Sequence, residues 1–209
     1  MRLVLASHNA KKLAEMRSLF APLGLDWRSC AELGIAEPVE PHRSFVENAL
    51  VKARHAAGHA GGAAIADDSG LCVHALGGAP GVDSATYARI EPRAGGREAQ
   101  RRLQDQANNE LLLERLRGVT DRRAHFVSTL VALRSATDPE PLIAVGRWQG
   151  QILETPRGRG GFGYDPLMFI PELGQCVAEL DLEAKNRFSH RALAAQRMLL
   201  AMRESWHLA

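Results

Sequence analysis

The chain has 209 residues, 45% of them apolar, a length that suits one large domain or two small lobes. Its formal net charge of +2 and its three scattered cysteines argue against a strongly basic nucleic-acid-binding protein, a disulfide framework and a zinc site. No apolar run approaches a transmembrane span, and the apolar start is too short for a signal peptide, so we expect a cytoplasmic protein without membrane or nucleic-acid partners.

Short strands and helices are predicted to alternate over the first sixty residues. A buried strand is expected at residues 3–6, and apolar positions spaced by three or four predict a helix over residues 10–23 that Gly24 ends. A second strand is expected at residues 25–30 and an alanine-rich helix at residues 43–60. Ser44, with Glu47 three residues later, has the pattern of a capping box at the start of that helix.

A third strand, at residues 64–66, ends in the acids Asp67 and Asp68. Carboxylates at the exposed end of a strand can bind a hard cation, because the strand holds them in rigid positions. Neighbouring strand residues point to opposite faces, so the two carboxylates face the same way only if the backbone turns, which Gly70 makes plausible. Asp-Ser-Gly is also ordinary turn chemistry, so these residues alone leave a solvated turn as the alternative.

The rest of the chain predicts a helix, two strands and a closing helix between glycine-rich loops. The loops are expected at residues 77–81 and 158–166, the helices at 97–116 and 189–206, and the strands at 125–133 and 142–148, with a hairpin connection at 138–141. This order predicts an α/β or α+β fold with a mixed sheet. Any two lobes are not sequential, because strands from both ends of the chain must share the sheet.

Basic groups begin two of the predicted helices. The first strand and helix are joined by Ser7-His8-Asn9-Ala10-Lys11-Lys12, where an anion could sit between the lysines and the positive helix end. The alternative is a plain Asn9 cap with solvated lysines. The last helix is preceded by Lys185 and begins at Ser189-His190-Arg191, which could donate to a carbonyl or phosphate, or form a solvated turn.

Lysine is rare in this chain, and each lysine lies in a segment that is singled out on other grounds. Of the 26 basic residues only four are lysines, namely Lys11, Lys12, Lys52 and Lys185. A lysine ammonium is a compact point charge suited to phosphate oxygens. Two further carboxylates, Glu40 and Glu47, could join Asp68 on a divalent cation.

The second glycine-rich loop carries two aromatic side chains and an acid. Phe162 and Tyr164 flank Gly163, and Asp165 follows. Aromatic rings in a loop that allows close approach could stack on a base. Alternatively, one of the rings anchors the loop in the core.

Taken together, these segments resemble the inosine/xanthosine triphosphate pyrophosphatases, which remove deaminated purine nucleotides. The motifs that carry the resemblance are Ser7 to Lys12, Ser44-Phe45-Val46-Glu47-Asn48-Ala49, Ala66-Asp67-Asp68-Ser69-Gly70-Leu71, Leu76-Gly77-Gly78-Ala79-Pro80-Gly81, Gly161 to Pro166, and Lys185 with Ser189-His190-Arg191. The resemblance spans essentially the whole chain. The first motif of the family more often reads Thr-Gly-Asn, and Val39-Glu40 stands where an acidic pair is often found.

The resemblance implies a magnesium-dependent (Mg²⁺) hydrolase that cleaves ITP, dITP or XTP between the α and β phosphates. It implies a homodimer and an elongated mixed α/β fold over residues 1–209, with a cleft between two lobes. Asp68 would be the general base and a magnesium ligand, with Glu40, or else Glu47, as the second ligand. Substrate would be bound by Ser7, His8, Asn9, Ala10, Lys11, Lys12, Ser69, Phe162, Gly163, Tyr164, Asp165, Lys185, His190 and Arg191.

Two other functions fit the same motifs. One is a broader nucleotide pyrophosphatase that acts on modified pyrimidine or standard deoxynucleoside triphosphates. The other is a nucleotide sensor that keeps the pocket without turnover, although a sensor would not need a base beside a metal.

Overall fold

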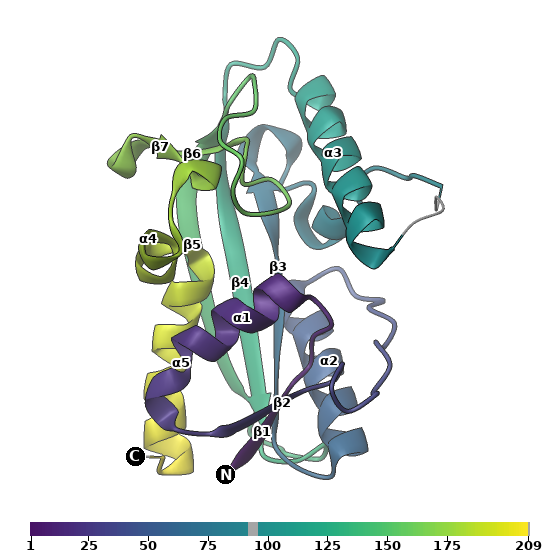
Figure 1. Cartoon of the computed structure of the whole chain (residues 1–209), viewed down its shortest axis with the longest axis vertical. Coiled ribbons are helices and arrows are strands. Elements are labelled where there is room, and N and C mark those ends of the chain that lie inside the picture. Colours follow the sequence, from purple (N-terminus) through teal and green to yellow (C-terminus); the bar gives the residue numbers. More distant parts are fainter. Residues whose placement is uncertain (92–95, 209) are drawn as a thin grey trace. The chain divides into compact units, whose positions relative to one another are not determined.

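The computed structural model describes residues 1–91 and 96–208 (Figure 1). The strands are β1 (Arg2–Leu5), β2 (Asp26–Ser29), β3 (Ala64–Val73), β4 (Arg123–Leu133), β5 (Leu142–Ile152), β6 (Met168–Ile170) and β7 (Gln175–Cys176). The α-helices are α1 (Ala10–Leu19), α2 (Phe45–Ala60), α3 (Arg97–Arg115), α4 (Leu182–Phe188) and α5 (His190–Trp206).

These strands form one mixed sheet in the order β2-β1-β3-β4-β5-β6-β7. β1 pairs in parallel with β2 and β3, whereas β6 pairs antiparallel with β5 and β7. Parallel neighbours need a crossover connection, and α1 and α2 supply it here. The predicted α/β fold with a mixed sheet is therefore confirmed.

The chain divides into two compact units, and neither is continuous in sequence. The first unit comprises Met1–Ser69, Ser128–Arg147 and Asn186–Ala209, and the second comprises Gly70–Val127 and Trp148–Lys185. β3, β4 and β5 each contribute residues to both units. A single domain over residues 1–209, its elongated shape and the cleft between its lobes stay predictions.

The first unit buries both faces of its part of the sheet under helices. α1 and α5 lie side by side and pack on one face (Figure 1). In β1, Leu3 and Leu5 point to that face, whereas Val4 points to the alanine-rich side of α2. The strand alternation therefore decides which helix each side chain meets.

β3 follows the same alternation up to its two acids. Ile65 packs in the cluster under α1 and α5, whereas Ala64 and Ala66 pack against the alanines of α2. Continued by one and two residues, this register directs Asp67 toward α1 and α5 and Asp68 toward α2. The local fold thus separates the two carboxylates.

The prediction that this strand ends at the acids is wrong. β3 continues to Val73, because Leu71 and Val73 keep the alternation and are both completely buried in the core of the second unit. No turn brings Asp67 and Asp68 to one face. A strand interior tolerates Asp67 here because buried partners satisfy its carboxylate, as described below.

The core of the second unit gathers apolar residues from α3 and from the strands. Leu112 of α3 and Leu116, which follows the helix, pack with Leu71, Trp148 and Met168. Asn108, also on α3 and 1% exposed, donates to the backbone carbonyls of residues 84 and 85. This helix therefore contacts both the core and a short 3₁₀ helix, Gly81–Thr86, of its unit.

Several predicted boundaries need correction. The helix predicted over residues 10–23 ends at Leu19, because Pro22 lacks the N–H that a continued α-helix would need. The second strand is shorter than predicted, and the strand predicted at residues 142–148 runs on to Ile152. Lys185 lies in a separate short helix, α4, while Ser189 caps α5 as predicted.

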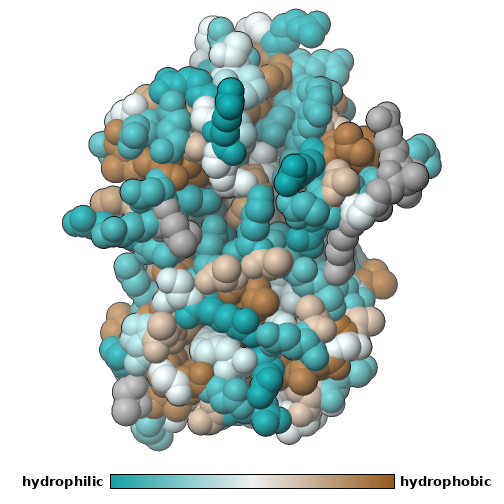
Figure 2. Space-filling model, viewed as in Figure 1, coloured by the Kyte–Doolittle hydropathy of each residue, from teal (hydrophilic) through white to brown (hydrophobic). Residues whose placement is uncertain are grey.

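The face drawn in Figure 2 mixes hydrophilic and apolar residues. Among the described residues, no helix is both long and apolar enough to cross a membrane.

Candidate active site

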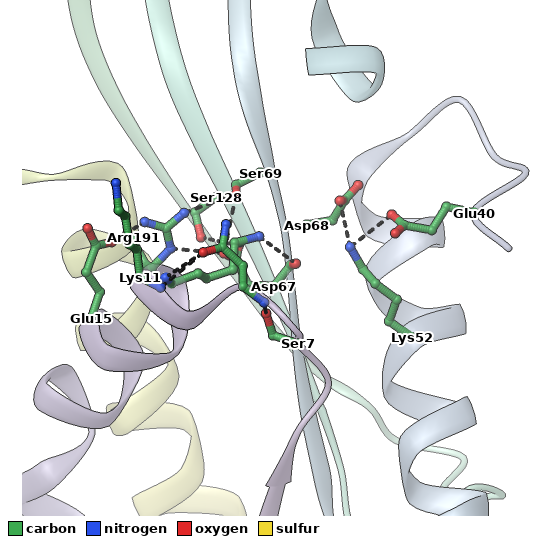
Figure 3. A network of polar contacts seen from close by, with 12 residues as sticks. Ser7, Lys11, Glu15, Glu40, Lys52, Asp67, Asp68, Ser69, Ser128 and Arg191 are labelled. Carbon is green, nitrogen blue, oxygen red and sulfur yellow. Dashed lines mark hydrogen bonds and ion pairs between the residues drawn. The ribbon is translucent and has the colours of Figure 1, made fainter. Parts of the chain in front are cut away.

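Asp68 shares a lysine with Glu40 on the α2 side of β3 (Figure 3). The Lys52 ammonium lies 2.8 Å from Oδ1 of Asp68 and 2.9 Å from Oε2 of Glu40. The side chains of Asp68 and Lys52 are only 11% and 12% exposed, whereas that of Glu40 is 40% exposed. The sequence prediction that places Glu40 near Asp68 therefore agrees with the geometry.

The charges of this cluster depend on one another. Burial raises the pKa of Asp68, against the opposing effect of Lys52. Burial also works against the charge on Lys52, but Asp68 and Glu40 outweigh it and raise the pKa of the ammonium. The second oxygen of Asp68, Oδ2, is buried and accepts no hydrogen bond. It is the oxygen that a cation or a water molecule could use.

The loop that carries Glu40 is fastened at both ends. Upstream, Nε2 of His55 lies 2.9 Å from the carbonyl oxygen of Ala36. Downstream, the buried amide of Asn48 accepts from the N–H of His42 and donates to its carbonyl. Glu40 is thereby held near Lys52 by local contacts.

Glu47 is engaged elsewhere, at the N-terminus of α2. Ser44 accepts a hydrogen bond from the N–H of Glu47, and its hydroxyl donates to the Glu47 carboxylate. This is a variant of the predicted capping box. The contacts favour Glu40 over Glu47 as the partner of Asp68.

Asp67 lies on the opposite side of β3 in a dense set of donors (Figure 3). Its oxygens lie 3.1 Å from Nζ of Lys12, 3.0 Å from Nε of Arg191 and 2.8 Å from Oγ of Ser128. Burial alone would raise the pKa of this carboxyl, but Lys12, Arg191 and the Ser128 hydroxyl hold it well below its usual range. Asp67 is therefore a buried carboxylate whose charge is balanced by Lys12 and Arg191.

Arg191 connects Asp67 to a second buried acid. This arginine is 3% exposed, and its remaining nitrogens donate to Glu15 of α1 and to the hydroxyl of Ser69. Burial opposes its charge, yet Asp67 and Glu15 raise its pKa. Acids and bases alternate along this chain of contacts, so each buried charge has a partner.

The segment between β1 and α1 forms a helix start that suits an anion. Asn9 caps α1, as in the alternative interpretation, by accepting from the N–H groups of Lys11 and Lys12. Lys12 turns inward to Asp67, whereas Ala10 and Lys11 are exposed. A pocket of about 120 Å³ opens here, lined by residues that include Ser7, His8, Asn9, Lys12, Glu37, Glu40, Lys52 and Asp67.

Comparison with known proteins shows the family of the chain. The model of the Ham1 family matches residues 3–201. The chain belongs to the Ham1 family. It is 67% identical to a protein of Methylibium petroleiphilum named dITP/XTP pyrophosphatase, over 99% of both chains. A protein of Leptothrix cholodnii with the same name is 61% identical over the full length of both.

Solved Ham1-family structures share the fold. A HAM1 protein from Coxiella burnetii superposes with a TM-score of 0.86 at 39% identity, covering 98% of this chain and 100% of that one. A nucleoside-triphosphatase / dITP/XTP pyrophosphatase from Mycobacterium abscessus gives 0.72 at 38% identity, covering 97% and 98%. The resemblance inferred from the motifs is thus confirmed.

In the second unit of this Ham1 protein, contacts from other elements hold the aromatic loop. α3 holds Gly163 from both sides, because Asp105 accepts from its N–H and Asn109 donates to its carbonyl, each at 2.9 Å. Tyr164 is 4% exposed, and its hydroxyl donates to the carbonyl of Ser84. Of the two alternatives for this ring, the contacts favour an anchor in the core.

The other predicted binding residues of this loop contact Lys185. Its ammonium lies 3.0 Å from Oδ2 of Asp165 and 5.3 Å from the centre of the Phe162 ring. The same carboxylate accepts from the N–H of Phe162. His190 is 9% exposed at the start of α5 in the first unit. Roles for these residues in substrate binding stay predictions.

Sequence reasoning left Lys52 out of the site, although it is the residue that joins the two carboxylates. Two signals could have found it. It is one of only four lysines, and it stands four residues after Asn48, on the same face of α2 as the amide that fastens the Glu40 loop.

Proposed function

We propose that this protein hydrolyses deaminated purine nucleoside triphosphates, namely ITP, dITP and XTP, to the monophosphate and pyrophosphate. The observation that carries the proposal is the buried Asp68–Lys52 pair, whose lysine lines the same pocket as the capped start of α1. Full-length relatives at 67% and 61% identity bear the name dITP/XTP pyrophosphatase, which supports the choice of substrate.

Magnesium is the cation that this donor set fits. It prefers one or two carboxylates and leaves its other positions to water and substrate phosphate. No group of three or more potential ligand side chains occurs among residues 1–91 and 96–208, and Asp68 with Glu40 makes a pair. Asp68 and Glu40 would hold the ion, with Oδ2 of Asp68 as an oxygen that no donor occupies. When bound, magnesium supplies charge neutralisation on the phosphates and on the departing pyrophosphate.

The residues of the chain supply binding and proton transfer. Lys12, Lys52 and the N-terminus of α1 present positive charge to the triphosphate in the pocket. Asp68 accepts the proton of the water that attacks the α-phosphorus and holds it on its carboxylate. The bond between the α-phosphorus and the bridging oxygen then breaks, and pyrophosphate leaves.

We assign base selection to the loop from Phe162 to Asp165, whereas a role for His190 and Arg191 in binding the base stays an implication of the resemblance. A site that hydrogen-bonds the 6-keto group of hypoxanthine or xanthine leaves its donor unpaired against the 6-amino group of adenine. Guanine shares the keto group, so its exclusion depends on the 2-position. Ser69 is assigned to the triphosphate and sugar, whereas the same role for Lys185 stays an implication of the resemblance.

Three further properties belong to this proposal. The protein acts as a homodimer in the cytoplasm, and it binds neither nucleic acid nor membrane. Each follows from the resemblance or from the composition.

The products of ITP hydrolysis test the assigned bond. With magnesium present we expect IMP and pyrophosphate in equal amounts, since attack at the α-phosphorus releases both in one step. Chelation of magnesium with EDTA should abolish the release. Separation of the products by anion-exchange chromatography measures both expectations. Formation of IDP and orthophosphate would show that a different bond is cleaved.

The same assay separates the alternatives. A broad pyrophosphatase would release pyrophosphate equally well from standard or pyrimidine triphosphates, and a sensor would bind ITP without forming products.

A further inference from the structure

Both carboxylate oxygens of Asp67 already accept hydrogen bonds from the protein. The Ser128 hydroxyl donates to Oδ1, while Arg191, Lys12 and Ser69 approach Oδ2. Its side chain is completely buried. A metal ion could reach this carboxylate only by displacing donors already in place, whereas Oδ2 of Asp68 accepts no hydrogen bond.

Among the donors around Asp67, Lys12 contacts this residue twice. The Lys12 ammonium lies 3.1 Å from the Asp67 carboxylate and 3.3 Å from the carbonyl oxygen of the same residue. Asp67 therefore holds Lys12 from two sides. Lys12 in turn lines the pocket at the start of α1.

Two charged side chains, Arg191 and Glu15, hold Asp67 in place. Arg191 contacts Asp67 through Nε and contacts Glu15 through Nη1, so it is itself fixed at both ends. These contacts come from the protein itself and need no anion in the pocket.

We propose that Asp67 is a positioning residue, which fixes Lys12 for the triphosphate and neither binds the metal nor takes part in proton transfer. This inference rests on the proposed function of the pocket. A free lysine side chain has many rotamers, and ordering it upon binding costs conformational entropy. When Asp67 orders Lys12 in advance, the triphosphate binds without that loss.

The test compares Asp67→Asn, Lys12→Ala and the double variant. For Asp67→Asn we expect KM for ITP to rise about tenfold, the scale of one lysine's rotamer entropy, with kcat and the half-saturating magnesium concentration nearly unchanged. Because Asp67 acts through Lys12, the double variant should bind no more weakly than Lys12→Ala alone. The Kd of inorganic tripolyphosphate, measured by calorimetry without magnesium, should rise by the same factor as KM.

Asp138→Asn provides the matched control. Asp138 lies in the first unit and is buried like Asp67, with exposed fractions of 3% and 2%. It pairs with an arginine, Arg134, but it does not line the pocket. This variant should lose stability and keep the tripolyphosphate Kd of the wild type. If Asp67→Asn does not fold, Ser128→Ala removes one donor from Asp67 and should raise that Kd by about twofold to threefold.

Three results would overturn the proposal. A higher half-saturating magnesium concentration in Asp67→Asn would make Asp67 a metal ligand. Additive effects of the two substitutions would show that Asp67 does not act through Lys12, and an unchanged tripolyphosphate Kd would leave it a purely structural residue. Because this Kd needs no turnover, a wild type that binds tripolyphosphate but does not hydrolyse ITP would refute the proposed activity alone.

Discussion

Replacement of Asp68 by asparagine is expected to lower kcat for ITP by at least about a hundredfold, the usual scale for losing a general base. Asparagine has nearly the same shape, so the packing of β3 is retained, but its amide cannot take up the proton of the attacking water. The loss also removes the anion that pairs with Lys52. Steady-state pyrophosphate release, with circular dichroism as a check on folding, measures the effect.

Glu47→Gln is the control for this experiment. Glu47 lies on the neighbouring helix α2, but its carboxylate bonds to Ser44 at the helix start and not to Lys52. The kcat of the Glu47→Gln variant for ITP should stay close to that of the wild type. If Asp68→Asn also keeps near-normal turnover, Asp68 is not the base.

Replacement of Arg191 by leucine is expected to lower the free energy of unfolding by about 3–5 kcal/mol, as when one partner of a buried ion pair is removed. The substitution leaves Asp67 and Glu15 without the cation between them, and both acids are at least nine-tenths buried. Urea denaturation followed by circular dichroism measures the loss. Arg191→Lys should recover part of it, because a lysine supplies the charge but not the forked geometry.

Arg123→Leu serves as the surface comparison. Arg123 pairs with Asp121 through two hydrogen bonds, but its side chain is 67% exposed, and exposed pairs contribute little. Its unfolding midpoint should hardly move. Equal losses for the two leucine variants would mean that the buried chain of charges does not stabilise the fold.

Local patterns predicted most helices and strands, but they missed β6, β7 and α4 and misplaced several ends. The apolar periods identified α1, α3 and α5, the alanine content identified α2, and Ser44 and Ser189 cap helices as expected. The strand containing Asp67 and Asp68 was cut short because acids are ordinarily a sign of a strand's end. The partners that allow Asp67 inside a strand, Ser128 and Arg191, are 61 and 124 residues away.

The site shows the same limit. Motifs placed Asp68, Glu40 and Lys12 in phosphate- and metal-binding segments. No local sequence pattern, however, shows that the Lys52 ammonium contacts the carboxylates of both Asp68 and Glu40. Likewise, a tyrosine in a glycine-rich loop suits stacking and anchoring equally well. The choice for Tyr164 depends on a hydrogen bond to Ser84, 80 residues earlier in the chain.

The most direct test of the central claim is magnesium-dependent pyrophosphate release from ITP, XTP and GTP at equal concentrations. We predict rapid release from ITP and XTP and none without magnesium. Release from GTP should be slower by at least about a hundredfold, as a hydrogen-bonding site can achieve. Equal release from all three nucleotides, or no release from ITP, would contradict the proposed function.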